Sequence, residues 1–134
     1  MRNRVPAEYL AETGQCGSCH GPLPPIAEPI DADPGLFEEV IRRTPVPVLV
    51  DFWAAWCGPC HMAAPEVQRA AANMAGQAVV LKVDTEAHPE LARRFGVQSI
   101  PTFAVLRRGE VVVQEPGYAP HTRLEQWLRE AARA

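Results

Sequence analysis

Apolar positions follow two different periods along most of this chain. Continuous or alternating apolar runs predict strands, and apolar residues that recur every three to four positions predict helices. The strongest strand signal is the nearly unbroken run VPVLVDFW over residues 46–53, which is typical of a central strand covered on both faces. Because Pro29 cannot donate a backbone hydrogen bond, the strand that contains it is expected at a sheet edge. The expected strands are residues 26–30, 46–53, 78–83, 102–107 and 111–115, the last two joined through a turn of Arg108, Gly109 and Glu110.

Helical periodicity fills the stretches between these strands. Asp33 followed by Pro34 is typical of an N-cap and a first helical residue. The expected helices cover residues 34–43, 59–75 and 88–95, with a final amphipathic helix whose apolar face carries Leu124, Trp127, Leu128 and Ala131. Strands that alternate with helices in this way predict an α/β domain.

The first 25 residues differ from the rest of the chain in apolar periodicity and proline content. They show little apolar periodicity, and eight of the 14 prolines fall within residues 1–47. We therefore expect two parts, an irregular N-terminal extension over residues 1–25 and one folded domain over residues 26–134. A chain of 134 residues is too short for two full domains.

Charge and hydropathy exclude several partners. The formal net charge is −3, with no basic run, which argues against nucleic-acid binding. No apolar run approaches the roughly 18 residues of a membrane span, so no membrane partner is expected. The N-terminus lacks the apolar core of a secretory signal, and the chain is expected to be cytoplasmic.

Two cysteines in the sequence WCGPC follow the strongest strand directly and open the helix at 59–75. At a helix N-terminus this spacing lets the sulfurs of Cys57 and Cys60 bond without distorting the backbone, while Gly58 and Pro59 complete the turn. Unpaired N–H groups and the helix dipole favour a thiolate at the first cysteine. Cys57 is the expected nucleophile, and Cys60, expected to be more shielded, resolves the mixed disulfide. An inert structural bridge is the alternative.

The segments VDFWAAWCGPC and SIPTF, the latter at residues 99–103, resemble the thioredoxin family, and the resemblance covers about residues 26–134. It implies a thioredoxin-like α/β fold, with a central mixed sheet flanked by helices on both faces and an irregular N-terminal arm. It also implies a thiol–disulfide oxidoreductase that reduces protein disulfides. By the same resemblance the bond from Ile100 to Pro101 is cis and faces the active-site disulfide, an ordinary trans turn being the alternative.

The family carries a buried aspartate and a lysine behind its second cysteine, and the matching positions here are Asp51 and Lys82. A carboxyl group inside an apolar strand has its pKa raised by desolvation, so Asp51 could accept a proton from Cys60 near neutral pH. Lys82 would be its charge partner. The alternative is a purely structural ion pair.

The resemblance also implies a substrate surface and a redox partner. The surface is expected over Trp56, Gly58, Pro59, Ile100, Pro101 and Gly117. Protein disulfides are the expected substrates, no organic cofactor is required, and an NADPH-dependent thioredoxin reductase would return the electrons. One departure from the family is His61, where Lys or Arg is usual, so the local charge depends on pH.

A second motif, CGSCH, lies in the N-terminal extension. Cys16, Cys19 and His20 resemble the zinc ribbon of the bacterial thioredoxin 2 type, but only one of its two C-x-x-C pairs is present. Zinc is therefore one candidate cofactor, a second redox pair or simple disulfide is another interpretation, and attachment of c-type haem is a third. His88 and His121 are expected at the surface and not as further ligands.

A different class of function stays open at this point. The chain could be a redox-inactive zinc-binding or scaffold module that uses a thioredoxin surface to bind a partner. The intact WCGPC sequence argues for the oxidoreductase.

Overall fold

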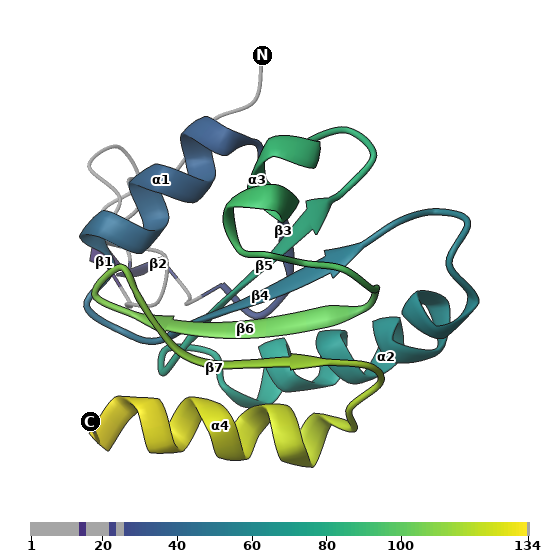
Figure 1. Ribbon diagram of the computed structural model, residues 1–134. Coiled ribbons are helices and arrows are strands. Elements are labelled where there is room, and N and C mark those ends of the chain that lie inside the picture. Colours follow the sequence, from purple (N-terminus) through teal and green to yellow (C-terminus); the bar gives the residue numbers. More distant parts are fainter. Residues whose placement is uncertain (1–13, 16–21, 24–25, 134) are drawn as a thin grey trace.

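A five-stranded mixed sheet forms the centre of the computed structural model, which describes residues 14–15, 22–23 and 26–133 (Figure 1). The strand order is β3-β5-β4-β6-β7. The strands are β3 (Ile30–Asp31), β4 (Val48–Trp53), β5 (Val79–Asp84), β6 (Thr102–Arg107) and β7 (Glu110–Pro116). β5 is parallel to both β3 and β4, whereas β6 is antiparallel to both β4 and β7. In the extension, β1 (Gly14–Gln15) and β2 (Pro22–Leu23) form a separate antiparallel pair.

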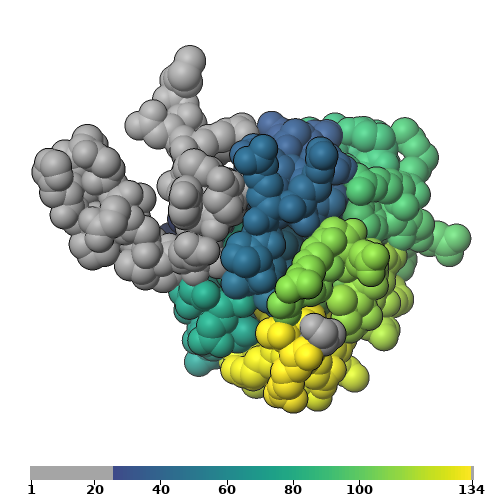
Figure 2. Space-filling view, turned by 90° about the vertical axis from the view of Figure 1, so that its left-hand side faces the viewer, coloured from purple at the N-terminus to yellow at the C-terminus, as the bar shows by residue number. Residues whose placement is uncertain are grey.

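Helices cover both faces of this sheet, as the sequence predicts. They are α1 (Pro34–Arg43), α2 (Gly58–Asn73), α3 (Pro89–Arg94) and α4 (His121–Arg133). In Figure 1, α1 and α3 lie on one side of the sheet and α2 and α4 on the other. Figure 2 shows the β6–β7 hairpin in light green between α1 in blue and α4 in yellow. The fold is the α/β sandwich expected from the motifs.

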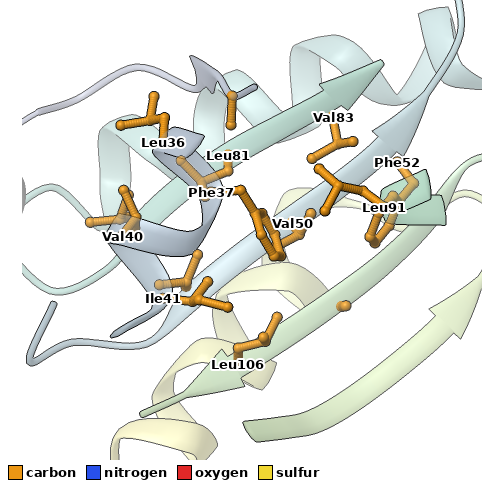
Figure 3. Close-up of a cluster of buried hydrophobic side chains, with 14 residues drawn as sticks. Leu36, Phe37, Val40, Ile41, Val50, Phe52, Leu81, Val83, Leu91 and Leu106 are labelled. Atoms are coloured by element: carbon orange, nitrogen blue, oxygen red, sulfur yellow. The ribbon is translucent and has the colours of Figure 1, made fainter. Parts of the chain in front are cut away.

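Two apolar cores fill the spaces between the sheet and its helices. The first lies beneath α1 and α3 and contains Leu36, Phe37, Val40, Ile41, Val50, Phe52, Leu81, Val83, Leu91 and Leu106 (Figure 3). The second, beneath α2 and α4, contains Leu49, Val67, Phe103, Leu124 and Leu128. Side chains alternate along a strand. Because Val50 and Phe52 enter the first core, Asp51 between them belongs to the face that α2 covers.

The edge strand differs from its predicted position. It covers only Ile30 and Asp31, which pair with Leu81 and Lys82 of β5, and the backbone N–H of Ala32 donates to the Lys82 carbonyl at 2.9 Å. The prediction of a strand over residues 26–30 was therefore wrong by several residues. Pro29 has no N–H to give to the ladder, which explains why pairing starts only after it.

The other predicted elements lie within a few residues of their observed bounds. Asp33 is the N-cap of α1, and its carboxylate accepts the Leu36 N–H at 2.7 Å. The hairpin turn contains only two residues, Arg108 and Gly109, with φ of 54° and 82°, and Glu110 already belongs to β7. Two consecutive positive φ values define the turn type whose twist matches paired strands, which is why the turn is shorter than expected.

Candidate active site

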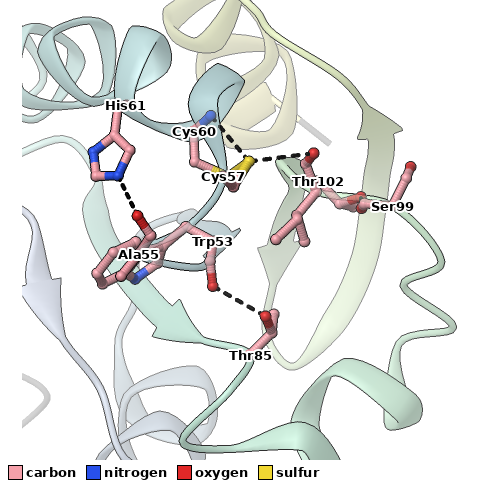
Figure 4. Close-up of a disulfide and its surroundings, with 9 residues drawn as sticks. Trp53, Ala55, Cys57, Cys60, His61, Thr85, Ser99 and Thr102 are labelled. Atoms are coloured by element: carbon pink, nitrogen blue, oxygen red, sulfur yellow. Dashed lines mark hydrogen bonds between the residues drawn. A yellow bond between two sulfur atoms is a disulfide. The ribbon is translucent and has the colours of Figure 1, made fainter.

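Cys57 and Cys60 form a disulfide where the chain passes from β4 into α2 (Figure 4). Cys57 is the N-cap of α2, and its sulfur accepts the Cys60 N–H at 3.2 Å. The two Cα atoms are 5.3 Å apart, inside the range that a disulfide spans without backbone movement. The N–H of Cys57 donates to the Ala54 carbonyl at 3.2 Å and closes the turn that leads into the helix. The first cysteine thus lies where the unpaired N–H groups of a helix stabilise a thiolate.

Overall burial does not separate the two cysteines, contrary to the expectation that Cys60 is more shielded. Cys57 is 3% exposed and Cys60 is 4% exposed. Surroundings distinguish them instead, because Cys57 borders a surface groove and Cys60 does not. The Cys57 sulfur also lies 3.6 Å from the carbonyl oxygen of Ile100. Access for an incoming disulfide is therefore through Cys57.

The groove beside Cys57 has a volume of about 480 Å³ and no charged side chain in its lining. Four of its residues belong to the predicted substrate surface: Trp56, Gly58, Pro59 and Ile100. Sequence reasoning missed Thr85, Ala92, Val97 and Gln98, which the fold brings to the groove from the turn after β5, from α3 and from the loop before β6. Ser99, also in the lining, belongs to the SIPTF segment, so a signal for it existed. Trp56 is 70% exposed, an unusual state for a large apolar side chain and one that suits a docking surface.

Pro101 and Gly117 lie outside the lining of this groove, but a backbone hydrogen bond joins them to each other. The peptide bond between Ile100 and Pro101 is cis. The Gly117 N–H donates to the Pro101 carbonyl at 2.7 Å. Gly117 has a φ of 94°, which favours glycine, and a Cβ placed there would meet no protein atom within 4 Å. The outer side of Gly117 is therefore open.

Asp51 is a buried carboxyl group on the α2 side of β4. It is 2% exposed, and its Oδ1 has no hydrogen-bond partner in the structure. Desolvation raises the pKa of Asp51 from 3.8 to about 7, although the positive charge of Lys82 lowers it in part. At neutral pH this group can therefore both accept and release a proton, as a general base requires.

Lys82 is the residue of β5 that pairs in register with Asp51. Its ammonium nitrogen lies 4.5 Å from the centre of the Trp53 ring. Among the described residues, no ion pair joins Lys82 to Asp51 within 4.0 Å. The positive charge of Lys82 therefore acts on Asp51 over more than the length of a direct ion pair.

His61 connects α2 to the loop that carries Trp56. Its Nε2 lies 2.6 Å from the Ala55 carbonyl oxygen, while the residue as a whole is exposed (Figure 4). Two hydroxyl groups fix neighbouring segments in a similar way. The Thr85 hydroxyl donates to the Trp53 carbonyl at 3.1 Å, and the Thr102 hydroxyl donates to the Ser99 carbonyl at 2.6 Å. The first bond joins the ends of β4 and β5, and the second closes the turn that leads into β6.

The positions of the predicted metal ligands are not described by the structure. Cys16, Cys19 and His20 lie outside the described residues. Within the described part of the chain, no group of three or more His, Cys, Asp and Glu side chains is arranged to hold a metal ion. None of the helices described is both long and apolar enough to cross a membrane.

A redox-active dithiol at a helix N-terminus, a cis-proline beside it and a buried carboxyl group behind it define a thioredoxin-fold oxidoreductase. Comparison with known proteins agrees. The family described as "Thioredoxin" matches residues 28–130, so the chain belongs to the thioredoxin family. It is a thioredoxin-type protein-disulfide reductase whose active-site pair is Cys57 and Cys60.

Individual relatives show how far the similarity extends. "Thioredoxin C-3" of Corynebacterium nephridii is 42% identical over 127 residues, which cover 95% of this chain and 86% of that protein. "Thioredoxin 1" of a Nostoc species is 44% identical over 92 residues, covering 69% of this chain and 86% of the relative. Among solved structures, a mutant thioredoxin from Halobacterium salinarum superposes with a TM-score of 0.73 at 30% identity, covering 79% of this chain and 92% of that one.

Proposed function

We propose that the chain reduces protein disulfides by a two-step exchange in which each residue of the site has a separate role. The Cys57 thiolate attacks one sulfur of the substrate disulfide, that bond breaks, and the other substrate sulfur leaves as a thiolate. Cys60 then loses its proton and attacks the Cys57 sulfur, which releases the second substrate thiolate. Two electrons have passed to the substrate, and the protein is left with the Cys57–Cys60 disulfide.

Asp51 is the proposed acceptor of the Cys60 proton. The observation that carries this proposal is the burial of Asp51 on the α2 side of the sheet, which raises its pKa to about 7. A carboxyl group with that pKa is half ionised at neutral pH, so it can take the proton during resolution and return it afterwards. Lys82 is proposed to keep the pKa of Asp51 from rising further, through its positive charge.

The substrate is proposed to lie as an extended segment over the groove and the cis-proline. Support comes from the exposed ring of Trp56, from the uncharged lining that includes Gly58 and Pro59, and from the backbone of Ile100 beside the Cys57 sulfur. An extended segment can pair with exposed backbone and so be held without regard to its sequence. Pro101 and Gly117 would shape the far side of this surface.

Insulin reduction tests the proposed reaction. With dithiothreitol as electron source, the protein should accelerate the precipitation of insulin chains, and Cys57→Ser should abolish the acceleration because the nucleophile is lost. Cys60→Ser should instead accumulate a mixed disulfide that mass spectrometry detects. Equal turbidity curves for the wild type and Cys57→Ser would contradict the reductase and favour a redox-inactive scaffold.

The electron donor is proposed to be an NADPH-dependent thioredoxin reductase, and the compartment the cytoplasm. The support is family membership, because relatives such as the "Thioredoxin" of Haemophilus influenzae are 38% identical over 91% of their length. The test is NADPH oxidation, followed by absorbance, in a mixture of this protein, insulin and a bacterial thioredoxin reductase. No oxidation above the rate without this protein would contradict the partner.

Residues 1–25 are proposed to be an extension to the domain at 26–134, of the type that carries zinc in thioredoxin 2. The spacing of Cys16 and Cys19, followed by His20, supports zinc binding. The match to thioredoxin C-3 covers more residues than 26–134 contain, so it reaches into the extension. Protein purified under reducing conditions without chelator should contain zinc, and less than about 0.2 zinc per chain would contradict a structural site.

A further inference from the structure

Helices α2 and α4 pack against each other on one face of the sheet and run in the same direction (Figure 1). Polar contacts join them at two points. Glu66 of α2 meets His121, the first residue of α4, and Asn73 at the end of α2 meets Glu125 one turn further along α4. The start of α2 carries Cys57, so the start of α4 is held at the same end of the molecule as the disulfide.

The first contact satisfies a backbone group that has no partner within its own helix. The His121 N–H donates to Oε1 of Glu66 at 2.8 Å. Pro120 precedes α4, and its carbonyl accepts the N–H groups of Arg123 and Leu124 at 3.0 and 3.2 Å. The N–H of His121 comes before these bonded groups and points out of the helix, as the first N–H groups of a helix do. A carboxylate at that position also complements the positive end of the helix dipole.

The second contact makes the attachment rigid. Glu125 is 5% exposed, and its Oε2 accepts the side-chain N–H of Asn73 at 2.9 Å and lies 2.8 Å from Nδ1 of His121. Its Oε1 lies 3.5 Å from the Arg129 guanidinium. Burial raises the pKa of Glu125, but the bonds from Asn73 and His121 and the nearby positive charges lower it below its ordinary value. His121, expected at the surface, is half-buried, and its ring takes part in this network.

The segment between β7 and α4 is consequently held at both ends. At one end, the Gly117 N–H bonds to the Pro101 carbonyl. At the other end, Glu66 holds the His121 N–H, and Ala119 between them is buried in the second core. We call residues 117–120 the docking loop. Tyr118 at its centre is 49% exposed, so the loop presents an aromatic side chain to the outside.

We propose that Glu66 is a positioning residue that fixes the docking loop relative to Cys57 and so sets the affinity for protein substrates. Glu66 belongs to the same helix that Cys57 caps, so α2 connects the nucleophile to the start of α4, although Pro65 inside this helix removes one backbone hydrogen bond between the two residues. Without this bond, the start of α4 can fray, and the docking loop is left with the Gly117–Pro101 hydrogen bond and the buried side chain of Ala119 to hold it against the cis-proline. The inference rests on the proposed role of Gly117 in substrate binding, and it assigns Glu66 no part in the chemical step.

The test compares Glu66→Ala with Glu66→Gln, whose amide oxygen still accepts the His121 N–H. Each variant is assayed with insulin, a protein disulfide, and with 5,5′-dithiobis(2-nitrobenzoic acid), a small disulfide that needs no docking loop. Glu66→Ala should raise the KM for insulin roughly tenfold, the lower end of what loss of one hydrogen bond to a charged group implies. Its kcat and its rate with the small disulfide should not change, and Glu66→Gln should restore most of the affinity. Arg69→Ala, an exposed change on the same helix, is the matched control.

Two outcomes separate failure of the inference from failure of the docking proposal. Gly117→Ala alters the docking loop directly, because alanine is strained at a φ of 94°. If Gly117→Ala raises the KM for insulin but Glu66→Ala behaves like Arg69→Ala, the role of Glu66 is wrong. If neither variant changes that KM, the docking loop does not bind substrate. A fall in kcat with both disulfides in Glu66→Ala would also overturn the inference, since it would place the effect at the dithiol.

Discussion

Replacing Asp51 by asparagine should stabilise the oxidised protein at and above neutral pH. The buried carboxyl group has a pKa of about 7 in the folded chain against an ordinary value of 3.8. Folding therefore favours the protonated form, and ionisation of Asp51 favours the unfolded chain. Asparagine has nearly the same shape and no charge, so it removes this penalty.

The size of the effect follows from the difference between the two pKa values. The folded value lies about three pKa units above the ordinary one, and each unit corresponds to ~1.36 kcal/mol. Raising the pH from below 4 to above 7 is therefore expected to lower the unfolding free energy of the wild type by roughly 4 kcal/mol through the ionisation of Asp51. Since the carboxyl group is only 2% exposed, solvent screening reduces this figure little.

The sign determines the pH window of the experiment. Below about pH 4 both states of the wild type bind the proton, so the variant and the wild type should be almost equally stable. Between pH 4 and 7 the folded state holds a proton that the unfolded state has lost, and the advantage of Asp51→Asn should grow by ~1.4 kcal/mol per pH unit. Above pH 7 the advantage should level off.

Guanidinium unfolding of the oxidised proteins at pH 4, 5.5, 7 and 8.5 measures this difference. Asp31→Asn is the control, because Asp31 is an exposed carboxylate on the edge strand and its removal should not reproduce the pH dependence. A stability difference between Asp51→Asn and the wild type that stays constant from pH 4 to 8.5 would refute the reasoning, since it would mean that Asp51 titrates equally in both states. The same variant should slow resolution of the mixed disulfide at pH 7 without slowing the first attack.

Two further predictions concern the helices. Glu125→Ala should lower the unfolding free energy by about 2 kcal/mol at pH 7. Because folding lowers the pKa of Glu125, this loss of stability should shrink as the pH falls below about 4.5. A loss of stability that grows as the pH falls would contradict the network. Asp33→Ala should cost about 1 kcal/mol through loss of the α1 N-cap, whereas Asp33→Asn, which still caps, should cost much less in the same denaturant assay.

Sequence motifs predicted the reactive part of the site well because its geometry is local. Cys57 and Cys60 are three residues apart, and the turn of one helix is enough to bring their sulfurs together. The N-cap at Asp33 is equally local, and it was predicted from the residue type and the proline that follows. Such features depend on a few neighbouring dihedral angles, which the residue types themselves restrict.

Elements whose bounds depend on pairing were predicted less well. The edge strand was placed too early, because only contact with β5 decides which residues around Pro29 enter the ladder. The groove lining from Thr85, Ala92 and Val97 was missed for a related reason. These residues are far from Cys57 in the sequence and carry no chemical signature, and only the order of the strands brings them together.

The amino-acid sequence by itself determined the α/β alternation, the helix start that activates Cys57 and the presence of a charged residue within an apolar strand. Tertiary structure decided that this residue, Asp51, is almost fully buried with Lys82 near it but not bonded to it, and that Glu66 reaches the first N–H of α4. The physical reason is the range of the interactions. Backbone periodicity and capping act over a few residues, whereas desolvation and contacts between helices depend on what packs across the sheet from distant parts of the chain.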